Sequence, residues 1–186
     1  SNVSHFNFYT SLPQDVNIAV SRCRKRFREA EDADIHVCLS HKRRRTISIA
    51  KQAQAAKGKI CVQIPAFELE PAYPCFVGTR LIGCCTNGRF VNGANYEVIG
   101  LSQSSIEEIF LKDLYTGQEF QTTPETVASH TLLKWAMTYH RLQGSTEKGT
   151  MLLHDLTSRH LKRAHLYVGV SRVTDGCNVF LADDSQ

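Results

Sequence analysis

The sequence contains no long apolar segment, no CxxC cysteine pair and no repeated or low-complexity stretch. A membrane-spanning helix needs roughly 18 uninterrupted apolar residues, and no run approaches that length, so an integral membrane protein is excluded. The first residues contain neither a basic region nor an apolar one, as a secretory signal would, and there is no initiator methionine. We therefore expect part of a longer, intracellular protein, in the cytoplasm or the nucleus and of cellular or viral origin, without a membrane partner.

Two further absences concern chemistry. No Gly-x-x-x-x-Gly-Lys-Ser/Thr pattern is present, so the chain lacks the loop that cradles nucleotide phosphates. No Asp-Glu pair ends an apolar strand to hold Mg²⁺. The seven cysteines lack metal-ligand spacing and are expected to be reduced thiols, mostly in the core, so no metal site is predicted. The chain alone is therefore expected not to hydrolyse a nucleotide.

The composition is that of a globular protein with one core, or one core and a small satellite domain. Of its 186 residues, 42% are hydrophobic and 22% are charged. The net charge of +4 is unevenly distributed, since residues 1–60 contain 12 Lys and Arg against 5 Asp and Glu. Two basic clusters, residues 22–28 and 42–45, carry this excess. They indicate either a polyanionic partner or ordinary solvated helix faces.

Hydrophobic periodicity predicts an α/β fold interrupted by a β-rich segment. Helices are expected over residues 14–33, 46–56 and 157–172, and buried strands over 34–40, 150–154 and 178–182. Residues 131–138 are predicted as a strand or a short helix. Short strands are expected at 59–64, 76–86, 96–102, 106–113 and 118–122, separated by turns at Asn87-Gly88, Asn92-Gly93 and Thr116-Gly117. The expected domains are 1–58 with 131–186, and an SH3-like insertion with its connecting strands at 59–130.

Two sequence blocks carry the chemistry. The first runs Ala136-Met-Thr138-Tyr-His140-Arg-Leu-Gln143-Gly144-Ser145-Thr146, and the second runs Leu166-Tyr-Val-Gly-Val-Ser171-Arg172-Val-Thr174. In this order and spacing they resemble the fifth and sixth motifs of superfamily 1 helicases, in the 5′-to-3′ branch that includes RecD and the Pif-type enzymes. Residues 77–93 resemble the strand and Asn-Gly turn that enter the SH3-like insertion of this branch.

The resemblance implies the second RecA-like lobe of an ATP-dependent helicase, a parallel sheet of the P-loop NTPase type. ATP with Mg²⁺ would be bound mainly by the first RecA-like lobe of the same full-length protein, which this chain does not contain. Single-stranded DNA or RNA is the other implied partner, and translocation and unwinding are the implied activities.

Arg172 is the candidate catalytic residue. In phosphoryl transfer, negative charge develops on the γ-phosphate oxygens, and an arginine delivered from a second lobe stabilises it. The same side chain at a helix end could instead cap the carbonyl groups of its own helix.

The other candidates are assigned by the resemblance. Those for nucleotide binding are Gln143 and Gly144, with one of Arg43, Arg44 and Arg45 where the fourth motif falls, at the end of a strand. This basic cluster could equally be a solvated face or a non-specific nucleic-acid patch. Those for contact with the single strand are Thr138, His140, Ser145 and Thr146. From the residues alone, 143–146 could equally be an ordinary glycine turn with a helix cap. The sequence departs from the family pattern at Leu142, where a small polar residue is common.

A different class of protein also fits the sequence, namely a non-catalytic nucleic-acid-binding module built on a helicase-like scaffold. In that case the SH3-like region and the basic clusters would bind, and the parallel sheet would be scaffold. Arg172 distinguishes the helicase lobe from the binding module. A module that only binds nucleic acid does not need an arginine finger, that is, an arginine that stabilises the charge on a transferred phosphate.

Overall fold

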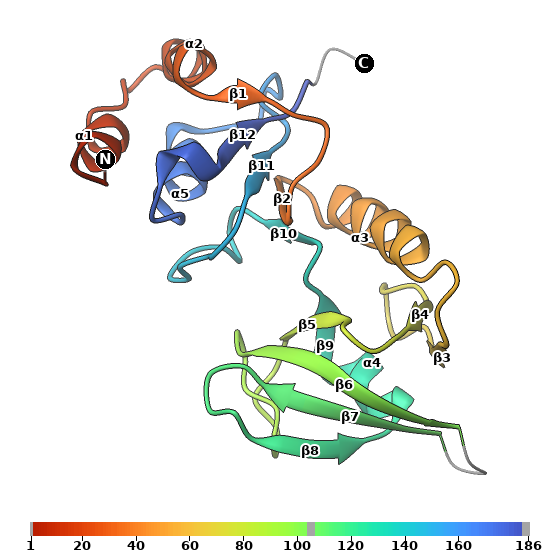
Figure 1. The fold of residues 1–186 in the computed structure, drawn as a ribbon. Coiled ribbons are helices and arrows are strands. Elements are labelled where there is room, and N and C mark those ends of the chain that lie inside the picture. Colours follow the sequence, from red (N-terminus) through yellow and green to blue (C-terminus); the bar gives the residue numbers. More distant parts are fainter. Residues whose placement is uncertain (1, 104–106, 184–186) are drawn as a thin grey trace. The chain divides into compact units, whose positions relative to one another are not determined.

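The computed structural model describes residues 2–103 and 107–183. The chain forms two compact units (Figure 1). Unit 1 comprises residues 1–44 and 136–186, and unit 2 comprises residues 45–135. The domain limits expected from the sequence, at 58/59 and 130/131, remain a prediction. Among the described residues, no helix is long and apolar enough to cross a membrane.

Unit 1 is built on a five-stranded sheet in which every pair of neighbours is parallel. The strand order is β1 (Arg28–Glu29), β12 (Val179–Leu181), β11 (Met151–Leu153), β2 (Ile35–Cys38) and β10 (Ala136–Thr138). All residues of β2, β10 and β11 are buried, as expected for strands covered on both faces. The α/β architecture expected from the sequence is thereby confirmed.

The helices of unit 1 are α1 (Asn2–Thr10), α2 (Val16–Arg26), α5 (Arg163–Ser171) and the first turn of α3 (His41–Ala55). A short 3-10 helix, η1 (Gly176–Asn178), precedes β12. Helices α1 and α2 both pack against α5 (Figure 1). Gly169 lets α5 approach the sheet, because an added Cβ would lie 2.8 Å from the Leu153 side chain. Close packing of α5 on β11 therefore explains the small residue in the second motif.

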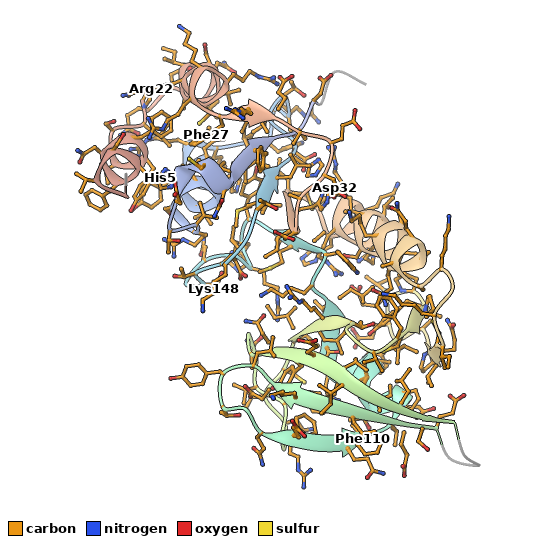
Figure 2. All side chains as sticks on the ribbon, viewed as in Figure 1. His5, Arg22, Phe27, Asp32, Phe110 and Lys148 are labelled. Carbon is orange, nitrogen blue, oxygen red and sulfur yellow. The ribbon has the colours of Figure 1, made fainter. Side chains whose placement is uncertain are left out.

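Two helix predictions in unit 1 are too long. The helix predicted over 14–33 begins after its Asp15 cap and ends at Arg26, because Phe27 takes an extended backbone and β1 then pairs with β12. Figure 2 shows Phe27 near His5, and their ring centroids lie 6.3 Å apart. The helix predicted over 157–172 begins at Arg163, since tight turns at Ser158 and Leu161 occupy the preceding residues. Helix α1 was not predicted.

Unit 2 contains a five-stranded antiparallel sheet in the order β8-β7-β6-β5-β9. These strands are β5 (Arg80–Gly83), β6 (Asn95–Gln103), β7 (Glu107–Asp113), β8 (Glu119–Thr122) and β9 (Thr131–Leu133). A hairpin of β3 (Val62–Ile64) and β4 (Tyr73–Cys75), helix α4 (Pro124–His130) and the rest of α3 complete the unit. The three predicted turns are confirmed, since Gly88, Gly93 and Gly117 all have positive φ.

The predictions for unit 2 need three corrections. Residues 76–86 are not one strand, because Phe76 and Thr79 form a hydrogen-bonded turn between β4 and β5. Residues 131–138 form two strands in different sheets, β9 in unit 2 and β10 in unit 1. Helix α4 was not predicted and begins with Thr123 accepting from the Thr126 N–H. Residues 104–106, at the start of one predicted strand, lie outside the described residues. The SH3-like class of this unit remains a prediction.

Candidate functional site

The candidate site lies along the carboxyl ends of the parallel strands in unit 1. Ligands of open α/β sheets bind at this edge, because the loops that follow neighbouring strands come together there. Strand β2 leads into residues 39–45, β10 into 139–146, and β11 into 154–155. The pairing of β2 with both β10 and β11 places these three segments next to each other. Two of the three contain residues that the sequence analysis singled out.

Arg43 is the arginine of the basic cluster that points to this edge. Ser40 caps the first turn of α3, with its Oγ accepting from the Arg43 N–H at 3.1 Å. The Arg43 guanidinium pairs with the Asp155 carboxylate and also contacts His154 Nδ1 at 3.2 Å. Lys42, Arg43 and Arg44 in the first turn of the helix oppose its dipole, and the Asp155 carboxylate offsets part of that charge.

Asp155 connects two of the loops. It is a non-glycine residue with positive φ, +64°, which turns the chain sharply after β11. Its carboxylate accepts the Leu39 N–H at 2.6 Å while it pairs with Arg43. The loop after β11 is thereby tied both to the end of β2 and to the start of α3. Backbone conformations of this type cluster at functional sites.

The three arginines of the cluster have different surroundings. Arg44 is only 2% exposed and is therefore part of the protein interior rather than a solvated face. Arg45 belongs to unit 2, where its guanidinium lies 3.9 Å from the Glu70 carboxylate. Arg43 is held at the carboxyl edge of the unit 1 sheet by Asp155 and His154, which both follow β11.

The loop after β10 folds on itself through two tight turns. The Thr138 hydroxyl accepts the Arg141 N–H at 3.2 Å, and the Gln143 and Ser145 N–H groups donate to carbonyls within the loop. Gly144 has a φ of +81°, a conformation that favours glycine. Gln143, Gly144 and Thr146 are exposed and accessible to a ligand, whereas the N–H groups of Arg141, Leu142, Gln143 and Ser145 already donate within the loop.

The candidates for contact with single-stranded nucleic acid differ in exposure. His140 is exposed, but Thr138 is only 4% exposed and its hydroxyl supports the loop. Ser145 is half-buried, and its hydroxyl donates to the Leu142 carbonyl at 3.0 Å. Leu142 is fully buried, so its departure from the family pattern supplies a core side chain beneath the loop.

Arg172 lies directly after α5 and joins the two sequence motifs. Its guanidinium donates to the Ser171 hydroxyl at 3.0 Å and to the Ser145 carbonyl at 3.5 Å. Its own carbonyl accepts the Glu147 N–H at 2.8 Å. Nη1 therefore reaches the 138–146 loop, while Nε and Nη2 donate to the Ser171 side chain at the end of α5. The position at a helix end expected from the sequence is confirmed.

The cysteine at this edge is not a nucleophile. Cys38 is fully buried, and its thiol lies 3.6 Å from the carbonyl oxygens of Ser40 and Met137. Burial, with the Asp155 carboxylate nearby, raises the pKa of the Cys38 thiol to about 12, so the reactive thiolate is absent at neutral pH. All seven cysteines carry free thiols, and the described residues contain no cluster of three metal-ligating side chains.

Sequence reasoning missed His154 and Asp155 at this edge, and His36 within β2. His36 and His154 are 5% and 8% exposed, and their ring nitrogens lie 2.9 Å apart. The available signal was a histidine inside or directly after an apolar strand, since a buried polar side chain needs a partner.

No protein-family model matches this sequence, and no curated protein matches it. Solved structures do. Pif1 helicase from Candida albicans is 11% identical, with a TM-score of 0.62 over 97% of this chain and 53% of the helicase. Bacteroides Pif1 bound to ssDNA is 17% identical, with a TM-score of 0.63 over 96% and 48%. Bacteroides sp Pif1 in complex with ADP-AlF4 is 15% identical, with a TM-score of 0.55 over 97% and 49%.

This likeness defines the fold. The chain has the fold of part of a Pif1 helicase, and it spans about half the length of the solved helicases that it matches. The RecA-like α/β fold expected from the sequence, and the resemblance to the Pif-type branch on which that expectation depends, are confirmed at the level of the fold.

Proposed function

We propose that this chain is the second RecA-like motor lobe of an ATP-dependent nucleic-acid helicase. In the full-length protein ATP with Mg²⁺ would bind between this lobe and a first lobe that carries the phosphate loop and the Asp-Glu motif. The proposal draws on the fold shared with Pif1 helicases, of which one solved example binds ssDNA and another ADP-AlF4. The single observation that carries it is the contact of Arg172 with the 138–146 loop.

That contact supports an arginine finger for a physical reason. A finger must be in position before charge develops, because preorganised groups stabilise the transition state without further reorganisation. The Ser145 carbonyl, the Ser171 hydroxyl and the Glu147 N–H hold the side chain and backbone of Arg172 in place. Arg172 would approach the γ-phosphate of ATP held by the first lobe.

The remaining candidates take the roles that their exposure permits. Gln143 and Gly144 would face the nucleotide, together with Arg43 at the strand edge. His140 and Thr146 are exposed and would contact the backbone of a single strand. Thr138 and Ser145 would act mainly by shaping that loop, since both use their hydroxyl groups within it. Arg44 and Arg45 would contribute positive potential rather than direct phosphate contacts.

The test compares this chain with the longer protein to which it would belong. The 186-residue chain should show no ATP hydrolysis above blank, with or without single-stranded DNA, because it lacks the phosphate loop. The longer protein should hydrolyse ATP, faster with a single strand present, and should unwind a forked duplex. Hydrolysis by the isolated chain that survives repurification would contradict the proposal. A longer protein that binds single strands without hydrolysing ATP would favour the non-catalytic binding module.

A further inference from the structure

A chain of hydrogen bonds runs along unit 1 from Asp32, before β2, to Arg43, at the start of α3. The Asp32 carboxylate lies 3.0 Å from His36 Nε2, and His36 Nδ1 lies 2.9 Å from His154 Nε2. His154 Nδ1 then lies 3.2 Å from Arg43 Nη2, and Arg43 pairs with Asp155. Figure 2 labels Asp32 on the segment that enters β2.

The residues at the two ends of this hydrogen-bond chain, Arg43 and Asp32, determine which ring nitrogens carry protons. Arginine has only donors, so His154 Nδ1 must accept from Arg43 and carry no proton. His154 Nε2 then carries the proton and donates it to His36 Nδ1. His36 Nε2 in turn donates to the Asp32 carboxylate, which accepts. Both imidazoles are therefore neutral with the proton on Nε2, and every donor in the chain points from Arg43 towards Asp32.

This arrangement has no place for an additional proton. The unprotonated nitrogens, Nδ1 of His36 and Nδ1 of His154, both already face donors. Protonation of His154 Nδ1 would set an imidazolium against the Arg43 guanidinium. Protonation of His36 Nδ1 would set it against the His154 Nε2 proton, which could leave only by moving to the side that faces Arg43. Either way a link of the chain breaks.

Charged and titratable groups face the histidine pair from several elements of unit 1. Asp32 faces it from the segment before β2, and Cys38 lies on β2 with its thiol kept neutral. Arg43 and Arg44 come from α3, and Asp155 from the end of β11; all three act electrostatically on Cys38. Tyr139, after β10, donates its hydroxyl to the His154 carbonyl at 2.9 Å. The His36–His154 pair is thus enclosed on several sides.

We propose that His154, whose protonation state is fixed by His36, is a positioning residue that holds the Arg43 guanidinium at the carboxyl edge of the sheet, in the geometry needed for ATP turnover. The role of Arg43 in ATP turnover rests on the proposed function. The hydrogen-bond chain itself does not depend on it. Asp155 fixes one side of the guanidinium and His154 the other. Loss of the His154 contact removes the hydrogen bond at Nη2 and leaves the pair with Asp155 at Nη1, so the guanidinium is less firmly oriented.

The first measurement examines the hydrogen-bond chain and needs no catalytic activity. Nitrogen-15 NMR of the 186-residue chain with labelled histidines should show His36 and His154 in the Nε2-protonated neutral form at pH 8. In Arg43→Gln the donor to His154 Nδ1 is lost, and a mixture of neutral forms should appear at His154. The exposed His160 serves as the reference within the same spectrum. An Nδ1 proton on His154 at pH 8 would overturn the proposal.

The second measurement uses two substitutions in the longer, hydrolysing protein. Asn places an amide oxygen close to the position of Nδ1, whereas Gln places its amide close to Nε2. His154→Asn should therefore keep an acceptor for Arg43, and His154→Gln should lose it. We expect His154→Gln to lower kcat/KM for ATP at pH 8 by up to about 10²-fold, the scale of a misplaced catalytic group. His154→Asn should keep most of its activity at pH 8.

The pH profile separates positioning from a purely structural role. The wild type should lose activity at acid pH, where protonation of the imidazoles breaks the contact with Arg43, while His154→Asn should retain it. Equal losses in both variants with an unchanged acid limb would overturn the proposal and leave the proposed function standing. A longer protein without any ATP hydrolysis would overturn both, and the NMR result would still report the hydrogen-bond chain.

Discussion

The two units bury different kinds of polar side chain. Unit 1 buries three histidines, an arginine and a glutamate, namely His5, His36, His154, Arg44 and Glu147. Among the described residues of unit 2, the buried polar side chains are neutral amides and hydroxyls: Ser48, Gln52, Thr79 and Thr131. Burial of an ionisable group costs free energy unless it is paired, so such groups persist where they serve a purpose. The candidate site therefore lies in the unit that buries the basic and acidic side chains.

Gln52 should show the largest effect on stability. Its side chain donates to the Pro74 carbonyl at 2.7 Å and to the Thr79 hydroxyl, and it accepts from the Trp135 indole at 2.7 Å. Gln52→Ala leaves these buried groups without that partner and should destabilise unit 2 by about 3 kcal/mol. Urea unfolding measures the change, and the exposed Gln54→Ala on the same helix is the control. If Gln52 has only a structural role, the decrease in the free energy of unfolding should be the same at pH 5 and pH 8.

His165 should show a smaller effect, and one that depends on pH. Burial, and secondarily Lys162, lowers the pKa of His165, whose Nδ1 accepts the Lys162 N–H at 3.0 Å. The unfolded chain therefore takes up a proton at a higher pH than the folded one. The stabilisation is complete above the unfolded pKa, near 6.5, and is lost as pH falls below it.

His165→Gln separates the cap from the titration. Gln at the third position of a helix can still accept from the cap N–H but does not titrate. Between pH 8 and pH 5 the variant should lose less stability than the wild type, by on the order of 1 kcal/mol, the scale of a helix cap. Thermal melting at the two pH values measures this, with the exposed His160→Gln as control. Identical pH dependence in all three proteins would remove His165 from the explanation.

His140 should show the smallest effect. Single-strand binding by the isolated chain should be weak and should fall steeply with salt, because it depends largely on released counterions. His140→Ala should lower affinity about two- to tenfold, the equivalent of one hydrogen bond. Fluorescence anisotropy with a labelled oligonucleotide at two salt concentrations measures this, and His160→Ala is the matched exposed control in the same unit. Equal affinities for the two variants would place the strand away from the 138–146 loop.

Local pattern predicted the parts of the fold that depend on neighbouring residues. The buried strands around Val37 and Leu152 and the glycine turns at 88, 93 and 117 follow from apolar runs and turn residues. The missed features depend on residues far apart in the chain. Strand β1 exists because it pairs with β12 some 150 residues later, and residues 131–138 divide because their two halves pair with different sheets.

The features of the candidate site also divide into those that local sequence reveals and those that depend on residues far apart in the chain. Arg172 and the 138–146 block could be recognised because their residues are contiguous. The contacts of Arg43 with His154 and Asp155 join residues more than 100 positions apart, so no local pattern contains them. The burial of Arg44 was likewise invisible in a run of four basic residues, since only packing distinguishes its side chain from those of its neighbours.

The most direct test of the account is Arg172→Ala in the longer protein, with ATP turnover, nucleotide affinity and melting temperature measured together. A finger arginine acts on charge that is absent from the ground state. We therefore predict that kcat falls by about 10³-fold or more while nucleotide affinity and melting temperature change little. The exposed Arg159→Ala is the control. A variant that melts early while its folded fraction keeps normal turnover would contradict the account and make Arg172 a structural residue.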